Sequence, residues 1–179
     1  KLFPAFDHLG NIGEQAEFAA QNGSTLIYVT GLGRYSYNGL PALSAMNEYL
    51  ENRKTYNFLA RASGGSIILS YLCATSIVGI DQFADHWDDY FPGRPPEFTP
   101  RQMLQQDIDG KDLPSWYGKL YSPADMWNPY WRTYTKKCIQ LAVTCGHSGV
   151  FFDNPTVSPK GNYSKWAMLA WSRFLRSRS

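Results

Sequence analysis

The sequence has 179 residues, 44% of them hydrophobic, which is enough to bury the core of a single domain. Its 17 basic and 15 acidic side chains leave a formal net charge of +2, too small to predict non-specific binding to nucleic acid or to an anionic membrane. Aromatic residues make up 16% of the chain, with six Trp and 12 Tyr, and these two residue types suit sites for flat, amphipathic ligands such as carbohydrates.

The cysteine and hydrophobic patterns argue against a disulfide-rich, zinc-binding or membrane-spanning protein. Three cysteines, Cys73, Cys138 and Cys145, are too few for a disulfide framework, and no CxxC pair predicts zinc. The sequence therefore predicts no metal and no cofactor. No apolar run approaches the roughly 20 residues of a membrane span, and the N-terminus lacks a signal-peptide pattern. The compartment stays open, with an extracellular or periplasmic one favoured. Asn22 and Asn162 lie in glycosylation-type tripeptides, which often arise by chance.

Four short segments are predicted to form buried strands, because they are apolar, rich in β-branched or aromatic residues and bounded by turn formers. In chain order they are residues 2–6, 25–30, 66–72 and 149–152. A short helix over residues 15–21 follows the first strand, with Asn11 as a capping residue and a stop at Gly23.

Helical segments are also expected after the later strands. Apolar residues at helical spacing predict a helix within residues 41–62, and Pro129 suits the first turn of a long helix. Further segments of helical character complete the prediction: residues 81–90, 101–106, 129–145 and 163–176.

Alternation of strands and helices with long connections predicts an α/β fold with a parallel sheet. Two closures fit this pattern: a small open doubly wound sheet, or about four βα units of a (β/α)8 barrel, which needs at least about 200 residues. We expect a single domain over residues 1–179 with an aromatic-rich insertion at about 73–128. In the barrel interpretation the chain corresponds to half of a barrel.

Polar residues at the strand ends are the candidates for function, because ligands bind at the carboxyl ends of parallel strands in both architectures. Asp7 and Asp153 follow the first and fourth strands, and two carboxylates are the minimum for glycoside hydrolysis. The alternative is that each Asp caps the turn that follows its strand. Tyr35, Tyr71 and Asn154 are candidate substrate-binding residues at the same rim.

Gly31 and Gly33 do not form a nucleotide-binding loop, because the third glycine of GxGxxG is absent. We expect them to form a tight turn that lets Tyr35 and Tyr37 reach over the rim. Cys73, just after the third strand, gives a weaker hypothesis: an open-sheet hydrolase with a thiol nucleophile. That mechanism requires His8 or His147 within hydrogen-bond reach.

The insertion carries an unusual number of aromatic residues. Their rings suit stacking on sugar faces, but a satellite core under a long loop would also use them, and the sequence leaves both interpretations open. The candidate substrate-binding rings in and beside this segment are Trp87, Trp116, Trp127 and Trp131.

The run Gly149-Val150-Phe151-Phe152-Asp153-Asn154 resembles the DGVFFDN-type signature of the fourth strand in several (β/α)8 glycoside hydrolases and hydrolase-like proteins. Ser148 replaces the Asp that often precedes the glycine. The resemblance implies that Asp153 is a catalytic or sugar-contacting carboxylate and that Trp116, Trp127 and Trp131 form subsite walls. In such families the second catalytic group commonly lies on a later strand.

Two hypotheses for the function follow. The first is a glycoside hydrolase-like domain that binds or cleaves a carbohydrate at its strand ends. The second is a non-catalytic carbohydrate-binding or assembly module that keeps the aromatic rim without a competent pair of carboxylates. In either case we expect a carbohydrate partner and no nucleic acid or membrane. A homodimer or a further C-terminal half would cover the exposed strand edges of a half-barrel.

Overall fold

The computed structural model describes most of the chain after residue 30. The described residues are 17–18, 21–23, 26–29, 31–62, 67–93, 95, 97–115, 117–155 and 158–178. The predicted strand at 2–6, most of the predicted helix at 15–21, and the candidate residues Asp7, His8 and Trp116 lie outside them.

The chain divides into two compact units. Unit 1 comprises Lys1–Ser36, Pro41–Leu72 and Lys137–Asp153. Unit 2 comprises Tyr37–Leu40, Cys73–Lys136 and Asn154–Ser179.

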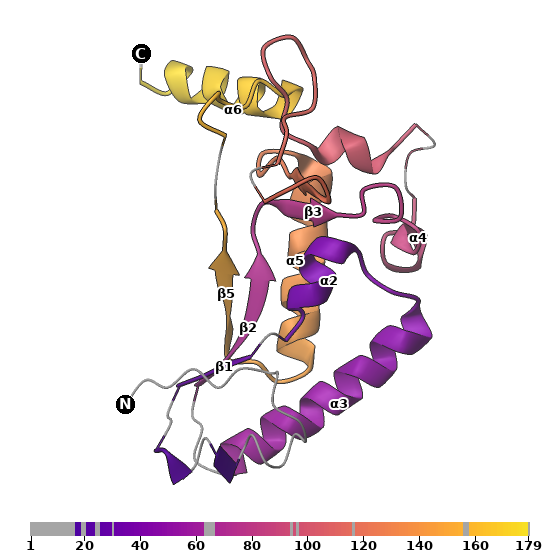
Figure 1. The fold of residues 1–179 in the computed structure, drawn as a ribbon, viewed down its shortest axis with the longest axis vertical. Coiled ribbons are helices and arrows are strands. Elements are labelled where there is room, and N and C mark those ends of the chain that lie inside the picture. Colours follow the sequence, from indigo (N-terminus) through magenta and orange to yellow (C-terminus); the bar gives the residue numbers. More distant parts are fainter. Residues whose placement is uncertain are drawn as a thin grey trace. The chain divides into compact units, whose positions relative to one another are not determined.

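A three-stranded sheet forms the centre of unit 1. Its strands are β1 (Leu26–Val29), β2 (Ile67–Cys73) and β5 (Gly149–Asp153), in the order β1-β2-β5. β1 and β2 are parallel, with Leu26 opposite Ile67, and the arrows of β2 and β5 point the same way in Figure 1. The predicted strands at 25–30, 66–72 and 149–152 are therefore confirmed, each within one residue at its ends.

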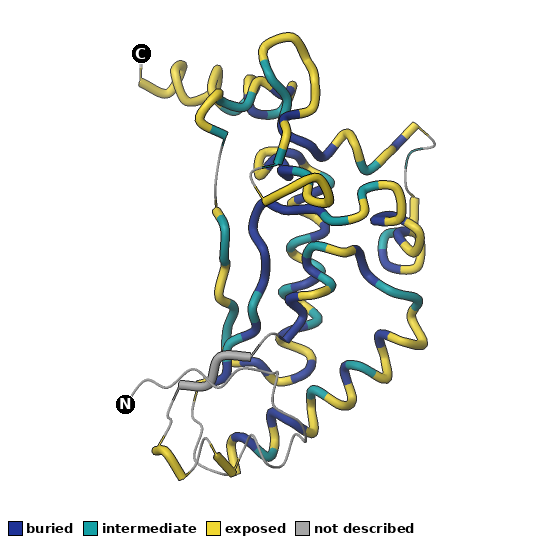
Figure 2. Tube along the Cα trace, in the orientation of Figure 1, coloured by how far each residue is buried: buried dark blue, intermediate teal, exposed yellow. Residues whose placement is uncertain are grey.

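Burial differs between the strands of this sheet. In β2, Ile68 and Ser70 are fully buried and Leu72 is almost so, whereas β5 is intermediate or exposed along its length (Figure 2). β5 lies at one end of the sheet, and no strand among the described residues pairs with its outer edge. Within β5, Phe151 and Phe152 are 43% and 39% exposed.

The three longer predicted helices are confirmed. α3 (Leu43–Ala62) buries one face, which includes Met46, Leu50 and Ala60. α5 (Pro129–Thr144) begins with proline in its first turn, and Asn128 Oδ1 accepts a hydrogen bond from Tyr130 N at 2.8 Å. α6 (Lys165–Arg176) is capped by Ser164, whose Oγ accepts from Ala167 N at 3.1 Å.

Ser148 and Arg61 join the end of α3 to the start of β5 within unit 1. Ser148 N donates to Ile68 O at 2.7 Å, and Ser148 Oγ accepts from Ile68 N at 3.1 Å. Arg61 donates to Gly146 O at 2.5 Å and to Ser148 Oγ at 3.2 Å. A hydroxyl at position 148 therefore has a structural role at the site where the resembling signature often has Asp.

Several short elements differ from the sequence prediction. Residues 33–38 form a helix, α2 (Gly33–Asn38), rather than only a turn. Of the predicted segment 81–90, only α4 (Trp87–Tyr90) is helical, and residues 101–106 contribute only to the 3-10 helix η1 (Pro100–Met103). After η1 the chain is extended, because Gln105 N donates a hydrogen bond to Pro123 O at 2.8 Å. This bond joins residues distant in sequence, so local periodicity does not reveal it.

A second, antiparallel sheet in unit 2 was not predicted. β3 (Ser76–Val78) pairs with β4 (Tyr121–Pro123), so that Ile77 lies opposite Ser122. Strands of three residues leave almost no periodic signal in a sequence.

An aromatic cluster forms the core of unit 2. Phe83 and Tyr134 have ring centroids 4.7 Å apart, and Trp87 lies 4.8 Å from Phe98. Trp131 is anchored at its polar end because its indole Nε1 donates to Ala74 O at 2.9 Å. Much of the insertion's aromatic content is therefore core.

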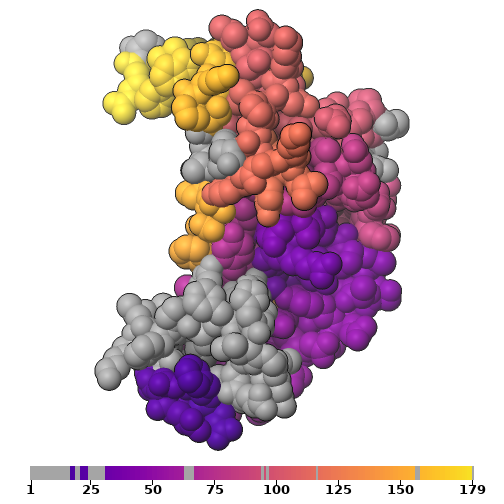
Figure 3. Space-filling model, viewed as in Figure 1, coloured from indigo at the N-terminus to yellow at the C-terminus, as the bar shows by residue number. Residues whose placement is uncertain are grey.

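The C-terminal segment packs on the insertion within unit 2. Tyr163 N donates to Gln106 O at 2.7 Å, and Asn162 Oδ1 accepts from Gln106 N at 3.2 Å. In the space-filling view the yellow atoms of α6 lie beside the rose atoms of the insertion (Figure 3). Among the described residues, no helix combines the length and apolar character that crossing a membrane requires.

Candidate functional site

The carboxyl ends of β2 and β5 carry a directly bonded pair of side chains in unit 1. Tyr71, near the end of β2, donates its hydroxyl to Asp153 Oδ2 at 2.8 Å, and Asp153 is the last residue of β5. Both residues are half-buried. Sequence reasoning named both residues, and the structure brings them together at the end of the sheet where ligands of parallel-sheet proteins bind.

The Tyr71 ring is held in place by close packing on both neighbouring elements. A Cβ atom at Gly33, the first residue of α2, would lie only 2.7 Å from Tyr71 Cδ1. The Tyr71 and Phe151 rings have centroids 6.3 Å apart. Gly33 is therefore required for close approach, so that the tyrosine hydroxyl is presented to Asp153 by a fixed ring.

The turn before α2 wraps over β2 through Ser70. Leu32 N donates to Ser70 Oγ at 3.0 Å, and Gly31 has φ +46°. A Cβ at Gly31 would collide with Ser70, and its backbone conformation is one that L side chains rarely adopt. The two glycines form a tight turn as predicted, and their close approach to Ser70 and Tyr71 supplies the physical reason.

Tyr35 lies on α2 and is half-buried. Its ring meets Tyr49 edge-on, with centroids 5.0 Å apart and an interplanar angle of 88°. The Tyr49 hydroxyl donates to Gly31 O, and the Arg53 guanidinium lies 5.2 Å from the Tyr49 ring centroid. These contacts tie α2 to α3 within unit 1.

Asn154 belongs to unit 2 and adopts φ +54°, the left-handed region that Asn tolerates better than most residues. Its side-chain oxygen accepts a hydrogen bond from the Tyr117 hydroxyl, and its backbone oxygen accepts one from Thr75 Oγ1. Tyr117, which sequence reasoning did not single out, is 47% exposed.

The candidate tryptophans occupy different environments. Trp87 and Trp131 are only 5% and 2% exposed and belong to the aromatic core of unit 2, so their rings offer no face to a ligand in this structure. Trp127 is 55% exposed. Trp116 lies outside the described residues.

Asp125, which sequence reasoning missed, is a fully buried carboxylate in unit 2. Its Oδ1 accepts hydrogen bonds from Trp127 N and Asn162 Nδ2, both at 2.9 Å, and its Oδ2 accepts from Ser164 Oγ at 2.6 Å. It therefore fixes both the segment before α5 and the cap of α6. The only sequence signal was its place in Ser122-Pro-Ala-Asp125, which does not distinguish it from a turn residue.

The environment of Cys145 disfavours this thiol as a nucleophile. Cys145 Sγ lies 3.2 Å from His147 Nδ1, and Asn57 Nδ2 donates to Cys145 O at 2.6 Å. However, burial raises the pKa of the Cys145 thiol to about 11, so the reactive thiolate is disfavoured at neutral pH. Cys73 is also buried, and its Sγ lies 4.0 Å from Asn154 Nδ2.

The charged residues of the described chain show no site for a metal ion. Among them no three His, Cys, Asp or Glu side chains gather closely enough to coordinate one. Asp7, the other predicted catalytic residue, lies outside this part of the chain. The carboxylate chemistry of the candidate site therefore centres on Asp153.

Comparison with known proteins shows similarity in fold. No family model and no curated protein matches the sequence. A noncanonic maltogenic α-amylase from Thermotoga neapolitana superposes with a TM-score of 0.54 at 12% identity over 99% of this chain and 43% of that one. A cycloisomaltooligosaccharide glucanotransferase from Paenibacillus sp., complexed with cycloisomaltoheptaose, gives 0.61 at 11% identity over 93% of this chain and 25% of that one.

The chain therefore has an α/β fold with parallel strands, consistent with part of a (β/α)-barrel-like architecture. The predicted fold class is confirmed. The chain spans less than half the length of both solved structures. At 11–12% identity the likeness concerns the fold alone.

Proposed function

We propose that this chain forms the sugar-contacting strand ends of a glycoside hydrolase-like protein, with Asp153 as the carboxylate that contacts the carbohydrate. The observation that carries this proposal is the 2.8 Å hydrogen bond from the Tyr71 hydroxyl to Asp153 Oδ2 at the ends of two neighbouring strands. Functional groups in active sites need such supporting bonds, because a carboxylate that rotates loses the geometry of the reaction.

The chemistry of the pair fits carbohydrate recognition. A carboxylate accepts hydrogen bonds from sugar hydroxyls, or acts as nucleophile or base in glycoside hydrolysis. Tyr71 serves as a positioning residue, because its hydroxyl binds one oxygen of Asp153 while Gly33 and Phe151 hold its ring. The resemblance of the Gly149–Asn154 run to a fourth-strand signature supports the same role for Asp153.

Glycoside hydrolysis requires a second carboxylate about 5 to 9.5 Å from the first. This separation decides whether the anomeric configuration is retained or inverted. We propose Asp7 for this role, or an acid on a further strand that pairs with the open edge of β5. The exposed Phe151 and Phe152 on that edge strand support the presence of such a cover, either a second copy of the chain or more of the same protein.

Glucose oligomers are the proposed ligands, because the names of the two similar structures refer to maltose-forming activity and to cycloisomaltoheptaose. The test is a calorimetric titration of the chain with maltoheptaose and with cycloisomaltoheptaose. Asp153→Asn is compared with Asp109→Asn, which makes the same chemical change at an exposed position in unit 2.

We expect the unaltered chain and Asp109→Asn to bind at least one of these oligosaccharides with equal affinity, and Asp153→Asn to bind at least about tenfold more weakly. Equal binding by Asp153→Asn, or no binding by the unaltered chain, would contradict the proposal. Release of reducing sugar in the same samples separates an enzyme from a module that binds without turnover.

A further inference from the structure

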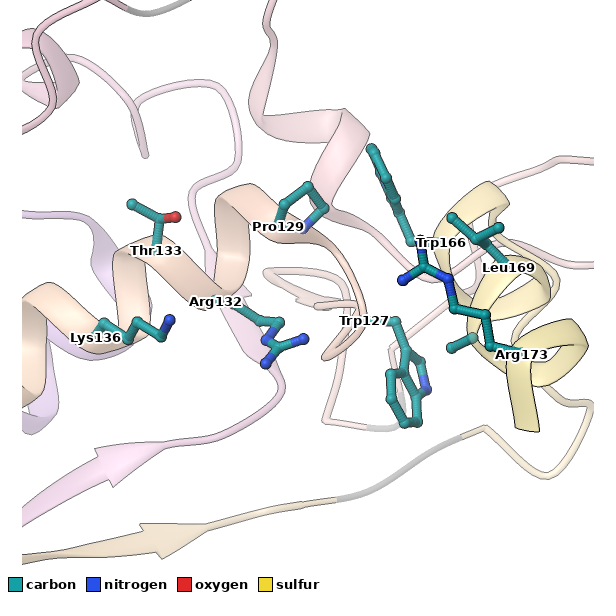
Figure 4. Close-up of a pocket in the computed structure, with 9 residues that line it drawn as sticks. Trp127, Pro129, Arg132, Thr133, Lys136, Trp166, Leu169 and Arg173 are labelled. Carbon is teal, nitrogen blue, oxygen red and sulfur yellow. The ribbon is translucent and has the colours of Figure 1, made fainter. Parts of the chain in front are cut away.

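A second candidate site lies in unit 2, between the first turns of α5 and the face of α6. It is an open pocket of about 460 Å³. Figure 4 shows Arg132 and Lys136 leaving α5 on one side and Arg173 leaving α6 on the other, with the Trp127 ring between Arg132 and α6 in this view. Pro129, Leu169 and Ala170 supply apolar surface.

The charge of this pocket is of one sign. Arg132, Lys136 and Arg173 line it and no acidic residue does. All three are exposed, and none of them forms an ion pair with another described residue. Arg132 and Lys136 are four positions apart on α5, so their side chains emerge on the same helix face and repel each other. A bound anion would relieve this repulsion.

Two indole rings line the same space. Trp127 is 55% exposed, and Trp166 is partly buried with Lys165 Nζ 5.1 Å from its ring centroid. Exposed indole faces stack on flat, amphipathic rings, and the nearby cations add a positive potential. The pocket therefore combines surfaces for a ring and for an anionic substituent.

The buried Asp125 holds both walls of the pocket in place. It binds Trp127 N on the α5 side and Ser164 Oγ, the cap of α6, on the other. Asn162 Nδ2 donates to the same carboxylate at 2.9 Å. A fully buried carboxylate with three hydrogen bonds is a costly arrangement, and it fixes the position from which each wall begins.

We propose that this pocket binds an acidic oligosaccharide, with a sugar ring against Trp127 and its carboxylates against Arg132, Lys136 and Arg173. The cations are spread over two helices instead of meeting at one point, which fits charges repeated along a chain of rings. A nucleotide concentrates its charge on adjoining phosphates, and the lining contains no glycine-rich loop to cradle them. The site shares no residue with the Tyr71–Asp153 pair and does not depend on the function proposed for it.

The experiment uses trigalacturonate as the acidic probe, maltotriose as the neutral one and AMP as the nucleotide, each titrated by calorimetry into the full 179-residue chain. Arg132→Ala and Arg173→Ala are compared with Lys119→Ala, which removes an exposed cation outside the pocket. Trp127→Phe keeps an aromatic ring while reducing the stacking surface. Circular dichroism checks that each variant is folded.

We expect saturable binding of trigalacturonate that weakens with added salt, because exposed ion pairs are screened. Arg132→Ala and Arg173→Ala should each weaken it by about tenfold, Trp127→Phe by a few-fold, and Lys119→Ala not at all. Absence of trigalacturonate binding would overturn the proposal. Equal binding of maltotriose, tighter binding of AMP, or unchanged binding in both arginine variants would do so as well.

Discussion

Tyr71 and Asp153, 82 residues apart in the sequence, are joined by a 2.8 Å hydrogen bond at the ends of adjacent strands. The bond exists because β2 and β5 are neighbours in one sheet and because Gly33 lets the Tyr71 ring lie close to α2. A carboxylate that caps only its own turn would not need a partner from another strand. The pair supports the role that we propose for Asp153.

Tyr71→Phe tests the positioning role directly. The ring contacts with Gly33 and Phe151 remain while the bond to Asp153 is lost, so we expect unfolding free energy to fall by only about 0.5–1.5 kcal/mol. The affinity for maltoheptaose should also fall, although the aromatic ring at position 71 keeps its place in the fold. Urea unfolding and calorimetry measure the two effects. A variant that binds as the unaltered chain does would show that Tyr71 does not position Asp153.

Gly33→Ala should destabilise unit 1 by about 1–3 kcal/mol, because the added methyl group would overlap the Tyr71 ring. The control is a double-mutant cycle with Tyr71→Ala, in which the ring is absent. If the overlap is the cause, the cost of Gly33→Ala nearly disappears in the Tyr71→Ala background. If Gly33→Ala still lowers the unfolding free energy in the Tyr71→Ala background, the cause lies in the conformation of α2 and not in overlap with the ring.

Asp125→Asn should cost about 2–4 kcal/mol of unfolding free energy, since the amide cannot accept all three hydrogen bonds that the carboxylate accepts. Asp109→Asn makes the same change at an exposed position and should cost almost nothing. Thermal and urea unfolding compare the two. Equal stability would show that Asp125 does not hold the segments before α5 and α6.

The raised pKa of Cys145 predicts that the free energy of unfolding falls as pH rises above 9. Burial raises this pKa from 9.0 to about 11, so below pH 9 both the folded and the unfolded chain keep the proton. Between pH 9 and 11 the unfolded chain loses it first, and stability falls as pH rises. The full loss is about 2–3 kcal/mol.

Cys145→Ala isolates this contribution, because the other groups that titrate in the same range remain. Urea unfolding of both proteins at pH 8 and near pH 10.5 gives the comparison. We expect the unaltered chain to lose about 2 kcal/mol more than the variant over this interval. Identical pH dependence would mean that the thiol is not desolvated in the folded chain.

The outer edge of β5 predicts self-association of the 179-residue chain, because Phe151 and Phe152 are exposed on an edge strand. Light scattering after size-exclusion chromatography measures the mass. A dimer that unfolds cooperatively supports covering by a second copy. A well-behaved monomer with cooperative unfolding would contradict the half-barrel interpretation and favour the open sheet.

The sequence predicted the elements that carry their own periodic signal. The strands near Leu26, Ile67 and Gly149 and the helices α3, α5 and α6 are apolar at regular spacing and bounded by turn formers, so local pattern was sufficient. β3 and β4 are too short for a pattern. The 3-10 helix η1 ends where Gln105 bonds to Pro123, a contact that depends on the tertiary fold.

Candidate residues were recognisable by position at strand ends but not by their partners. Asp153 and Tyr71 were both named, yet the bond between them depends on strand order. Trp87 and Trp131 have the same residue type as the exposed Trp127, and only packing distinguishes core from surface. Asp125 was missed because its role depends on three hydrogen-bond donors that the sequence does not connect to it. One is the backbone N of Trp127, and the other two are the side chains of Asn162 and Ser164.

A crystal structure of the chain with maltoheptaose bound tests directly whether Asp153 contacts the carbohydrate. We predict a glucose ring at the ends of β2 and β5, with a hydroxyl about 2.7–3.2 Å from the Asp153 carboxylate and the hydrogen bond from Tyr71 preserved. A sugar ordered only elsewhere on the chain, with Asp153 making no contact to it, would contradict the role proposed for Asp153.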